Sequence, residues 1–171
     1  MNRQSELSTY LNDPYAQAYP ETAPFWAAAE RGQLLLRTCN QCNRAHWYPR
    51  VVCPLCASDD TDWKPASGLG SLYAFSIIER ADPPYALAYV ELDEGPIILS
   101  NLVDCDIRAA KIGQRVSAVF RQTPDGRYAP FFLHALRRPR ASLVSPNENL
   151  CKSPYDLQRP EVRRAMARSG A

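Results

Sequence analysis

The sequence predicts a mainly β protein, and two patterns carry that prediction. Two cysteine pairs, Cys39–Cys42 and Cys53–Cys56, have the same two-residue spacing, and from Gly68 onward short β-like runs alternate with turn residues. We expect four segments: an arm over residues 1–21, a helix and metal-binding ribbon over 22–66, a β-domain over 67–138, and a basic, proline-containing tail over 139–171.

The segment before the cysteines predicts one short helix. Residues 1–21 lack helical and strand periodicity and contain the turn formers Asn12-Asp13-Pro14 and Tyr19-Pro20, which indicates an extended arm. Thr22 is placed to cap a helix that Gly32 ends, with a proline tolerated in its first turn. The apolar face of this helix is formed by Phe25, Trp26 and Ala29.

The four cysteines predict a structural metal site. Ten residues separate the two pairs, and each pair can turn tightly and present two thiolates to one tetrahedral ion, as in zinc ribbons. A strand over Leu34–Thr38 runs into the first pair, and a return segment over Trp47–Val52 runs into the second. Because four protein ligands leave no position for water or substrate, we expect a structural Zn²⁺ held by Cys39, Cys42, Cys53 and Cys56.

Other chemistry of the cysteines and histidines has less support. A rubredoxin-like iron centre uses the same four thiolates, whereas a redox dithiol needs one pair and a disulfide framework fits a reducing compartment poorly. Cys105 and Cys151 are expected to be inert thiols, His46 a solvated residue of the metal loop, and His134 a satisfied barrel residue. With no recognisable nucleophile, base and orienting group together, we assign no catalytic residue. One acidic cluster consists of Glu91, Asp93 and Glu94. A solvated turn explains this cluster better than catalysis by paired carboxylates.

Five candidate strands follow Gly68, with one or two helical turns over Asp106–Ile112 after the third strand. This order is typical of a small Greek-key barrel of the OB type, and a plain five-stranded sandwich fragment is the alternative. The strands are expected at Leu72–Glu79, Ala86–Asp93, Ile97–Val103, Arg115–Gln122 and Phe131–Arg137.

The charge is divided unevenly along the 171 residues. The formal net charge is +2, but residues 137–171 hold eight basic and three acidic residues, which makes them +5 and the rest −3. Proline interruptions and few large apolar residues prevent this tail from forming a core, although Pro160–Arg168 could form a terminal helix. The tail therefore fits an arm that docks on an acidic partner.

Two absences in the sequence bear on the compartment. No run approaches the roughly 18 apolar residues of a spanning helix, and the polar amino terminus lacks the features of a secretory signal. We therefore expect a cytoplasmic protein without a membrane partner.

The order of these features resembles one known family. The resemblance is carried by Phe25-Trp26, Gly32–Cys39, Cys53–Cys56, Gly68–Phe75 and Ala88–Gly95. These motifs are similar to the family once called domain of unknown function thirty-five, over roughly residues 22–136. The resemblance implies an N-terminal helix, a rubredoxin-like zinc ribbon and an OB-fold.

The same resemblance implies an accessory subunit of a thiolase-like protein, whose chain would supply the catalytic Cys and His residues. The complex would carry out thiolytic cleavage, acyl transfer or retro-aldol cleavage of CoA esters, and this subunit would bind acyl-CoA or complete its channel. A CoA ester needs cations for its phosphates and rings for adenine. Candidate contacts are Arg44, Arg50, Arg80, Tyr85 and Phe75.

A module that binds single-stranded nucleic acid is the main alternative, because zinc ribbons and OB-folds also occur in such proteins. That function needs a basic groove. Residues 68–136 hold six basic and eight acidic side chains, which disfavours it. A rubredoxin-type electron carrier is a third possibility and would be coloured by iron.

Overall fold

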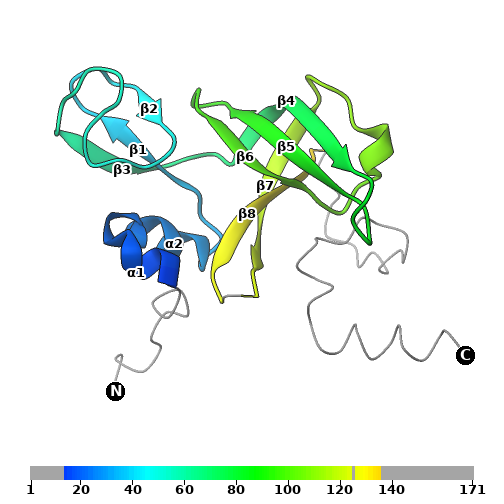
Figure 1. The fold of residues 1–171 in the computed structure, drawn as a ribbon. Helices are drawn as coiled ribbons and strands as arrows, with labels where there is room; N and C mark the ends of the chain where they lie inside the picture. Colours follow the sequence, from blue (N-terminus) through cyan, green and yellow to red (C-terminus); the bar gives the residue numbers. More distant parts are fainter. Residues whose placement is uncertain (1–13, 125, 136–171) are drawn as a thin grey trace, which may run out of the picture.

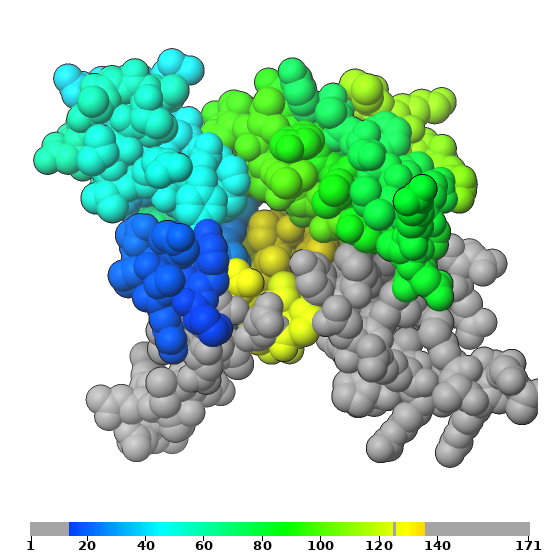
Figure 2. Space-filling view, in the orientation of Figure 1, coloured from blue at the N-terminus to red at the C-terminus, as the bar shows by residue number. Residues whose placement is uncertain are grey.

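The protein combines two β-structures with a pair of short helices, as a computed structural model shows (Figure 1). The structure describes residues 14–124 and 126–135. A three-stranded sheet, in the order β2-β1-β3, forms the ribbon, and a closed barrel has the order β4-β5-β6-β8-β7. Ribbon and barrel lie side by side, with the helices on the same side of the barrel as the ribbon (Figures 1 and 2). The predicted mainly β architecture, a helix and a metal ribbon followed by an OB-type barrel, is confirmed.

The amino-terminal segment is more helical than its sequence indicated. Helix α1 spans Pro14–Ala18, a 3₁₀ turn spans Pro20–Thr22, and α2 spans Ala23–Ala29. The expectation of an extended arm is therefore wrong for residues 14–21, while residues 1–13 lie outside the described part. Pro14 and Pro20 each occupy the first position of a helical segment, where proline is tolerated because its missing N–H has no partner in any case.

Helix α2 has the predicted apolar face and end. Phe25, Trp26 and Ala29 are buried. Gly32 has a φ of +72°, its N–H donates to Ala29 O, and the Gln33 N–H donates to Ala28 O. This pair of hydrogen bonds is a Schellman motif, which needs a left-handed residue such as glycine at this position.

The ribbon is built from strands on both sides of the cysteine pairs. Strand β1 spans Leu35–Cys39, β2 spans Ala45–His46 and β3 spans Thr61–Pro65. The expected return segment at Trp47–Val52 is not a strand. The actual partner along the whole of β1 is β3, which sequence analysis missed because its residues are mostly polar or exposed and show no clear alternation.

The barrel strands appear where the sequence predicted them, with shifts of up to three residues. They are β4 (Leu69–Ile78), β5 (Tyr85–Leu92), β6 (Ile97–Leu102), β7 (Arg115–Gln122) and β8 (Tyr128–His134), and a 3₁₀ turn at Ile107–Ala109 follows β6. The parallel pair Leu102↔Phe132 closes the barrel. Strand β8 starts earlier than expected and includes Pro130. Strand β8 pairs with β6 only at Phe132. Along the rest of β8 the side next to β6 is therefore an edge, where proline is tolerated.

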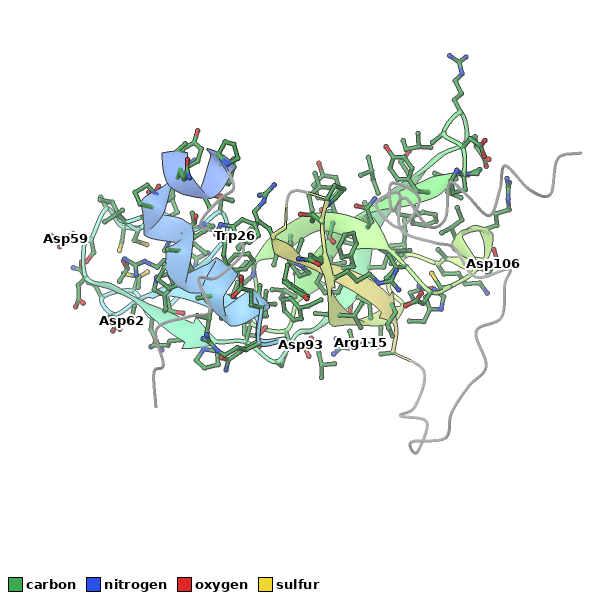
Figure 3. The ribbon with its side chains drawn as sticks, turned by 90° about the horizontal axis from the view of Figure 1, so that it is seen from below. Trp26, Asp59, Asp62, Asp93, Asp106 and Arg115 are labelled. Carbon is green, nitrogen blue, oxygen red and sulfur yellow. The ribbon has the colours of Figure 1, made fainter. Side chains whose placement is uncertain are left out.

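One core runs from the helices through the ribbon to the barrel interior. Its fully buried members include Phe25, Leu36, Leu72 and Phe132. The loop between β7 and β8 reaches the helices, where the Arg127 guanidinium lies 4.9 Å from the ring centre of Trp26. Trp26 accordingly lies between α2 and the barrel (Figure 3). No helix within the described residues is long and apolar enough to cross a membrane.

Candidate functional site

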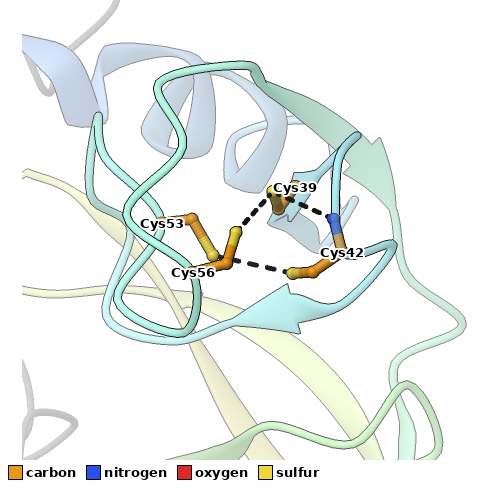
Figure 4. A group of neighbouring side chains, drawn as sticks. All are labelled: Cys39, Cys42, Cys53 and Cys56. Atoms are coloured by element: carbon orange, nitrogen blue, oxygen red, sulfur yellow. Dashed lines mark hydrogen bonds between the residues drawn. The ribbon is translucent and has the colours of Figure 1, made fainter.

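The four predicted cysteines form a compact group. Cys39 ends β1, Cys42 follows in the turn, and the second pair lies in the loop before β3 (Figure 4). All four Sγ atoms lie within 4.8 Å of one another, with 3.5 Å between those of Cys39 and Cys56 and 3.8 Å between those of Cys42 and Cys53. A tetrahedral ion with Zn–S bonds of about 2.3 Å places its sulfur atoms about 3.8 Å apart. The donor set and its spacing therefore fit one zinc ion.

The two cysteine pairs lie in loops with the same backbone geometry. In the first loop the Cys39 N–H donates to Arg44 O, and in the second the Cys53 N–H donates to Ser58 O, each five residues along the chain. The residue four positions after the first cysteine has a positive φ in both loops: Asn43 at 54° and Ala57 at 61°. These matched turns aim backbone N–H groups at sulfur, because Cys42 N lies 3.5 Å from Cys39 Sγ and Leu55 N lies 3.4 Å from Cys53 Sγ.

The thiols influence one another strongly. The hydrogen bond from the Cys42 backbone N–H is the main cause that lowers the pKa of Cys39 to about 7. The Ser58 backbone N–H lowers the pKa of Cys56, but desolvation and the hydrogen bonds with the other three thiols outweigh it and raise that pKa to about 12. Without a cation the four thiolates repel one another, so a divalent ion is what allows all four to ionise together.

The remaining sulfur and imidazole groups are not part of this centre. His46 is buried, contrary to the expectation of a solvated loop residue, because β2 pairs it with Arg37 of β1. Its Nε2 lies 3.4 Å from Arg50 O. Cys105 is buried in the core, and Cys151 lies outside the described residues. His134 Nε2 accepts a hydrogen bond from the Gln114 side-chain amide.

The five predicted ligand contacts lie in separate places. Arg44 lines a cavity of about 360 Å³ between the ribbon and the β5–β6 turn. Arg50 lines another cavity, of about 550 Å³, with Tyr15, Tyr19 and Tyr48. Burial, followed by a hydrogen bond with Tyr15, raises the pKa of Tyr48, so this ring stays neutral.

The other three contacts belong to the first hairpin of the barrel. Arg80 is exposed in the β4–β5 turn, while Tyr85 at the start of β5 and Phe75 in β4 are half-buried. None of these three lines either of the two cavities that Arg44 and Arg50 line. The structure therefore places the predicted contacts at three locations.

Hydrogen bonds organise the acidic cluster at the end of β5, namely Glu91, Asp93 and Glu94. The sequence analysis expected only a solvated turn there. Arg115 binds both carboxylate oxygens of Asp93, at 2.7 and 2.6 Å (Figure 3). These hydrogen bonds hold the pKa of Asp93 below its ordinary value. Glu94 accepts a hydrogen bond from the Ser67 N–H, which joins the barrel to the segment that leaves the ribbon.

Sequence analysis missed an exposed apolar surface on the barrel. We define the β4–β6 outer face as the outward side of these three strands, and its exposed apolar residues include Tyr73, Tyr89, Ile97 and Leu99. Buried and exposed residues alternate along β5 in the structure, but Glu91 is the one charged residue of that strand, so its sequence shows no such alternation. The sequence therefore did not reveal that one side of these strands would stay uncovered by described residues.

Comparisons with known proteins agree with this architecture. A family model described as "ChsH2, rubredoxin-like zinc ribbon domain" matches residues 26–62, and one described as "ChsH2, C-terminal OB-fold domain" matches residues 63–121. A DUF35 domain-containing scaffold protein of Methanothermobacter thermautotrophicus is 33% identical over 110 residues, which are 60% of this chain and 83% of the relative.

Two further similarities concern proteins with named activities. A chain of the solved structure described as "Ltp2-ChsH2(DUF35) aldolase" is 29% identical, with a TM-score of 0.59, and the match covers 67% of this chain and 94% of the other. A probable enoyl-CoA hydratase alpha subunit of Thermomonospora curvata is 33% identical over 98 residues, which are 54% of this chain and 31% of the relative.

A four-cysteine zinc ribbon followed by an OB-fold barrel defines the class of this protein. Both family models and the coverage of the scaffold relative identify the group within that class. The chain belongs to the DUF35 family.

Proposed function

We propose that this protein is a zinc-containing scaffold subunit that binds a thiolase-superfamily enzyme and binds acyl-CoA or completes its channel. The similarity to a chain of the Ltp2-ChsH2(DUF35) aldolase carries the proposal, because that description names a DUF35 protein together with a second component. The scaffold name of the methanogen relative supports the same role.

The metal centre supports a division of labour between this chain and its partner. Four protein ligands fill a tetrahedral shell, so a zinc ion held there has no position for a substrate or an activated water. The ion would hold the ribbon in its folded form. Thiolytic, acyl-transfer or retro-aldol chemistry would then be supplied by the partner enzyme.

Acyl-CoA as the ligand is supported by the name of the hydratase relative and by two cavities that each offer one arginine, beside Glu94 in one and Glu21 in the other. Arg44 and Arg50 line separate cavities on the ribbon, and the Arg50 cavity also offers three tyrosine rings. Arginine suits phosphate groups, and aromatic rings suit an adenine base. Either cavity could take part of a CoA ester once the partner closes over it.

Co-expression with a thiolase-superfamily protein encoded beside this gene tests the scaffold role. Size-exclusion chromatography with light scattering, followed by native mass spectrometry, should show a stable hetero-complex with about one zinc per copy of this chain. A protein that stays monomeric beside that enzyme would overturn the proposal.

Calorimetric titration of the complex with an acyl-CoA tests the ligand. Replacing Arg44 or Arg50 with alanine should weaken binding, whereas Lys64→Ala, at an exposed position of β3, should leave it unchanged. Equal affinity in all variants would remove both cavities from the proposal and leave the scaffold role intact.

A further inference from the structure

The β4–β6 outer face is a continuous apolar surface across three strands. Tyr89 of β5 lies opposite Leu99 of β6 and opposite Ala74 of β4. Strand β4 has a β-bulge next to Ala74, and Tyr73 is the extra residue of this bulge. Tyr73, Tyr89 and Leu99 are 57%, 48% and 51% exposed. These strands lie on the near side of the barrel in Figure 1. A cluster of exposed large apolar side chains in a soluble protein marks a surface that something covers.

One end of this face is acidic. Glu91 lies on the same side of β5, opposite Ser71 of β4 and Ile97 of β6. The described residues form three ion pairs, and Glu91 takes part in none of them. Glu94 lies three residues further along the chain, whereas the charge of Asp93 is already paired with Arg115. An occupant of the face that carries positive charge at this end would therefore be favoured.

The chain leaves the barrel beside that acidic end. The Ala135 N–H donates to Arg115 O, Arg115 lies opposite Ser71, and Ser71 lies opposite Glu91. Three strand spacings of about 4.8 Å place Glu91 about 14 Å from Ala135. Five extended residues span about 17 Å, so the segment that follows Ala135 can reach Glu91 by crossing the outer side of β7 and β4.

The composition of residues 136–171 complements this surface. The first residues beyond Ala135 include Arg137, Arg138 and Arg140, and the apolar pair Leu143-Val144 follows three residues later. A segment with this spacing, laid along the face, would carry its cations near the acidic end and its apolar side chains further along. These residues carry a net charge of +5 from position 137 onward.

We propose that residues 136–171 bind across the β4–β6 outer face of their own barrel. The three arginines lie next to Glu91, and apolar side chains from Leu143 onward cover Tyr89 and Leu99. The contact lies within one chain, so it holds or fails independently of the scaffold role.

Photo-crosslinking of the purified full-length protein tests this contact. Leu99 is replaced by p-benzoylphenylalanine, and the same replacement at Val51, an equally exposed apolar residue of the ribbon, is the matched control. Irradiation should join position 99 to residues 136–171 of the same chain, as located by peptide mass spectrometry, and position 51 should give no such product. Crosslinks from position 99 to a second copy of the chain, or only to an added partner enzyme, would overturn the proposal.

Trypsin cleavage after Arg137 and Arg140 gives a second measurement, because Arg138 is followed by Pro139 and is not a cleavage site. Leu99→Glu should speed cleavage after Arg137 and Arg140 about tenfold, because it removes the apolar contact that shields them. Val51→Glu should cleave at the wild-type rate, and Glu91→Lys should cleave faster than wild type. Equal rates in the wild type and Leu99→Glu would contradict the contact.

Discussion

At the residue scale, the fold depends on a few polar side chains that make specific interactions. Thr22 is fully buried, and its hydroxyl donates to Tyr19 O and accepts from Trp26 Nε1. This threonine therefore caps α2 differently from the usual hydrogen bond to a backbone N–H: it holds the preceding turn and the indole together. The four cysteines have an equally specific role, because each supplies one corner of the metal site.

Replacing one metal ligand should abolish zinc binding. In Cys56→Ser we expect elemental analysis to fall from about one zinc per chain to a small fraction of that value, and the ribbon to unfold. The free energy of zinc binding, roughly 10 kcal/mol or more in comparable sites, is coupled to folding. Cys105→Ala removes a buried thiol outside the site and should retain the metal. Full zinc content in Cys56→Ser would contradict the four-ligand assignment.

Replacing Thr22 with valine should destabilise the protein by about 1–3 kcal/mol, because the variant keeps the shape but leaves the buried Trp26 N–H without an acceptor. Urea unfolding monitored by fluorescence measures this difference. Thr22→Ser keeps the hydroxyl and should lie close to wild type. Equal stability of the valine and serine variants would show that the hydroxyl contributes nothing.

At the element scale, the strands pack so closely that one position accepts only glycine. A Cβ atom built on Gly70 of β4 would lie 2.5 Å from Glu91 O and 2.9 Å from Val90 Cγ1 of β5. The ends of β5 and β7 are joined differently, by the two hydrogen bonds between Arg115 and Asp93. The first contact lies within one hairpin of consecutive strands, whereas the second links strands that are distant in sequence.

Gly70→Ala should destabilise the barrel by about 1–3 kcal/mol, because β4 and β5 must move apart to admit the methyl group. Ser76→Ala, at an exposed position of the same strand, is the control and should have little effect. Denaturant unfolding of the two variants gives the comparison. Wild-type stability of Gly70→Ala would show that the strands can separate at this point at no cost.

The Asp93–Arg115 pair should make a small, pH-dependent contribution to stability. The pKa of Asp93 is lower in the folded protein than its ordinary 3.8, so the stabilisation is present above about pH 4 and is lost as the pH falls through the folded value. Thermal unfolding of wild type and Asp93→Asn should therefore differ at pH 7 and converge at the lowest pH values. A difference that grows toward low pH would contradict this assignment.

At the scale of the whole molecule, one arginine connects the helices to the barrel. The Arg127 guanidinium, from the β7–β8 loop, lies 4.9 Å from the ring centre of Trp26 and 5.3 Å from that of Tyr15. Contacts between α2 and β8 continue this junction. The helices therefore belong to the same core as the barrel and the ribbon.

Arg127→Met should weaken this junction by about 2 kcal/mol, since it keeps an apolar stem but loses the cation above two rings. Thermal unfolding and tryptophan fluorescence measure the effect. Arg80→Met, at an exposed turn, should behave like wild type. Equal stability of both variants would assign the junction to apolar packing alone.

A feature could be predicted from the sequence when it depends on residues that are close together in the chain. The metal ligands were predictable because paired cysteines act within one turn, and Gly32 was predictable because a helix end needs a left-handed residue locally. Strand β3 was not, since its polar residues become a strand only through pairing with β1. The helical form of Pro14–Ala18 was also missed, because its signal comes from packing of Ala16 into the core.

The sequence by itself determined the four zinc ligands, the approximate positions of the barrel strands along the chain and the family, because motif spacing and turn residues are local properties of the chain. The tertiary structure alone decided that Arg44, Arg50 and Arg80 lie apart, that Arg127 covers two rings, and that one side of β4–β6 is exposed. Each of these depends on which distant segments pack together. Which segments pack together is decided by the burial of the apolar surfaces of the whole chain at the same time, and no local stretch of sequence determines that outcome.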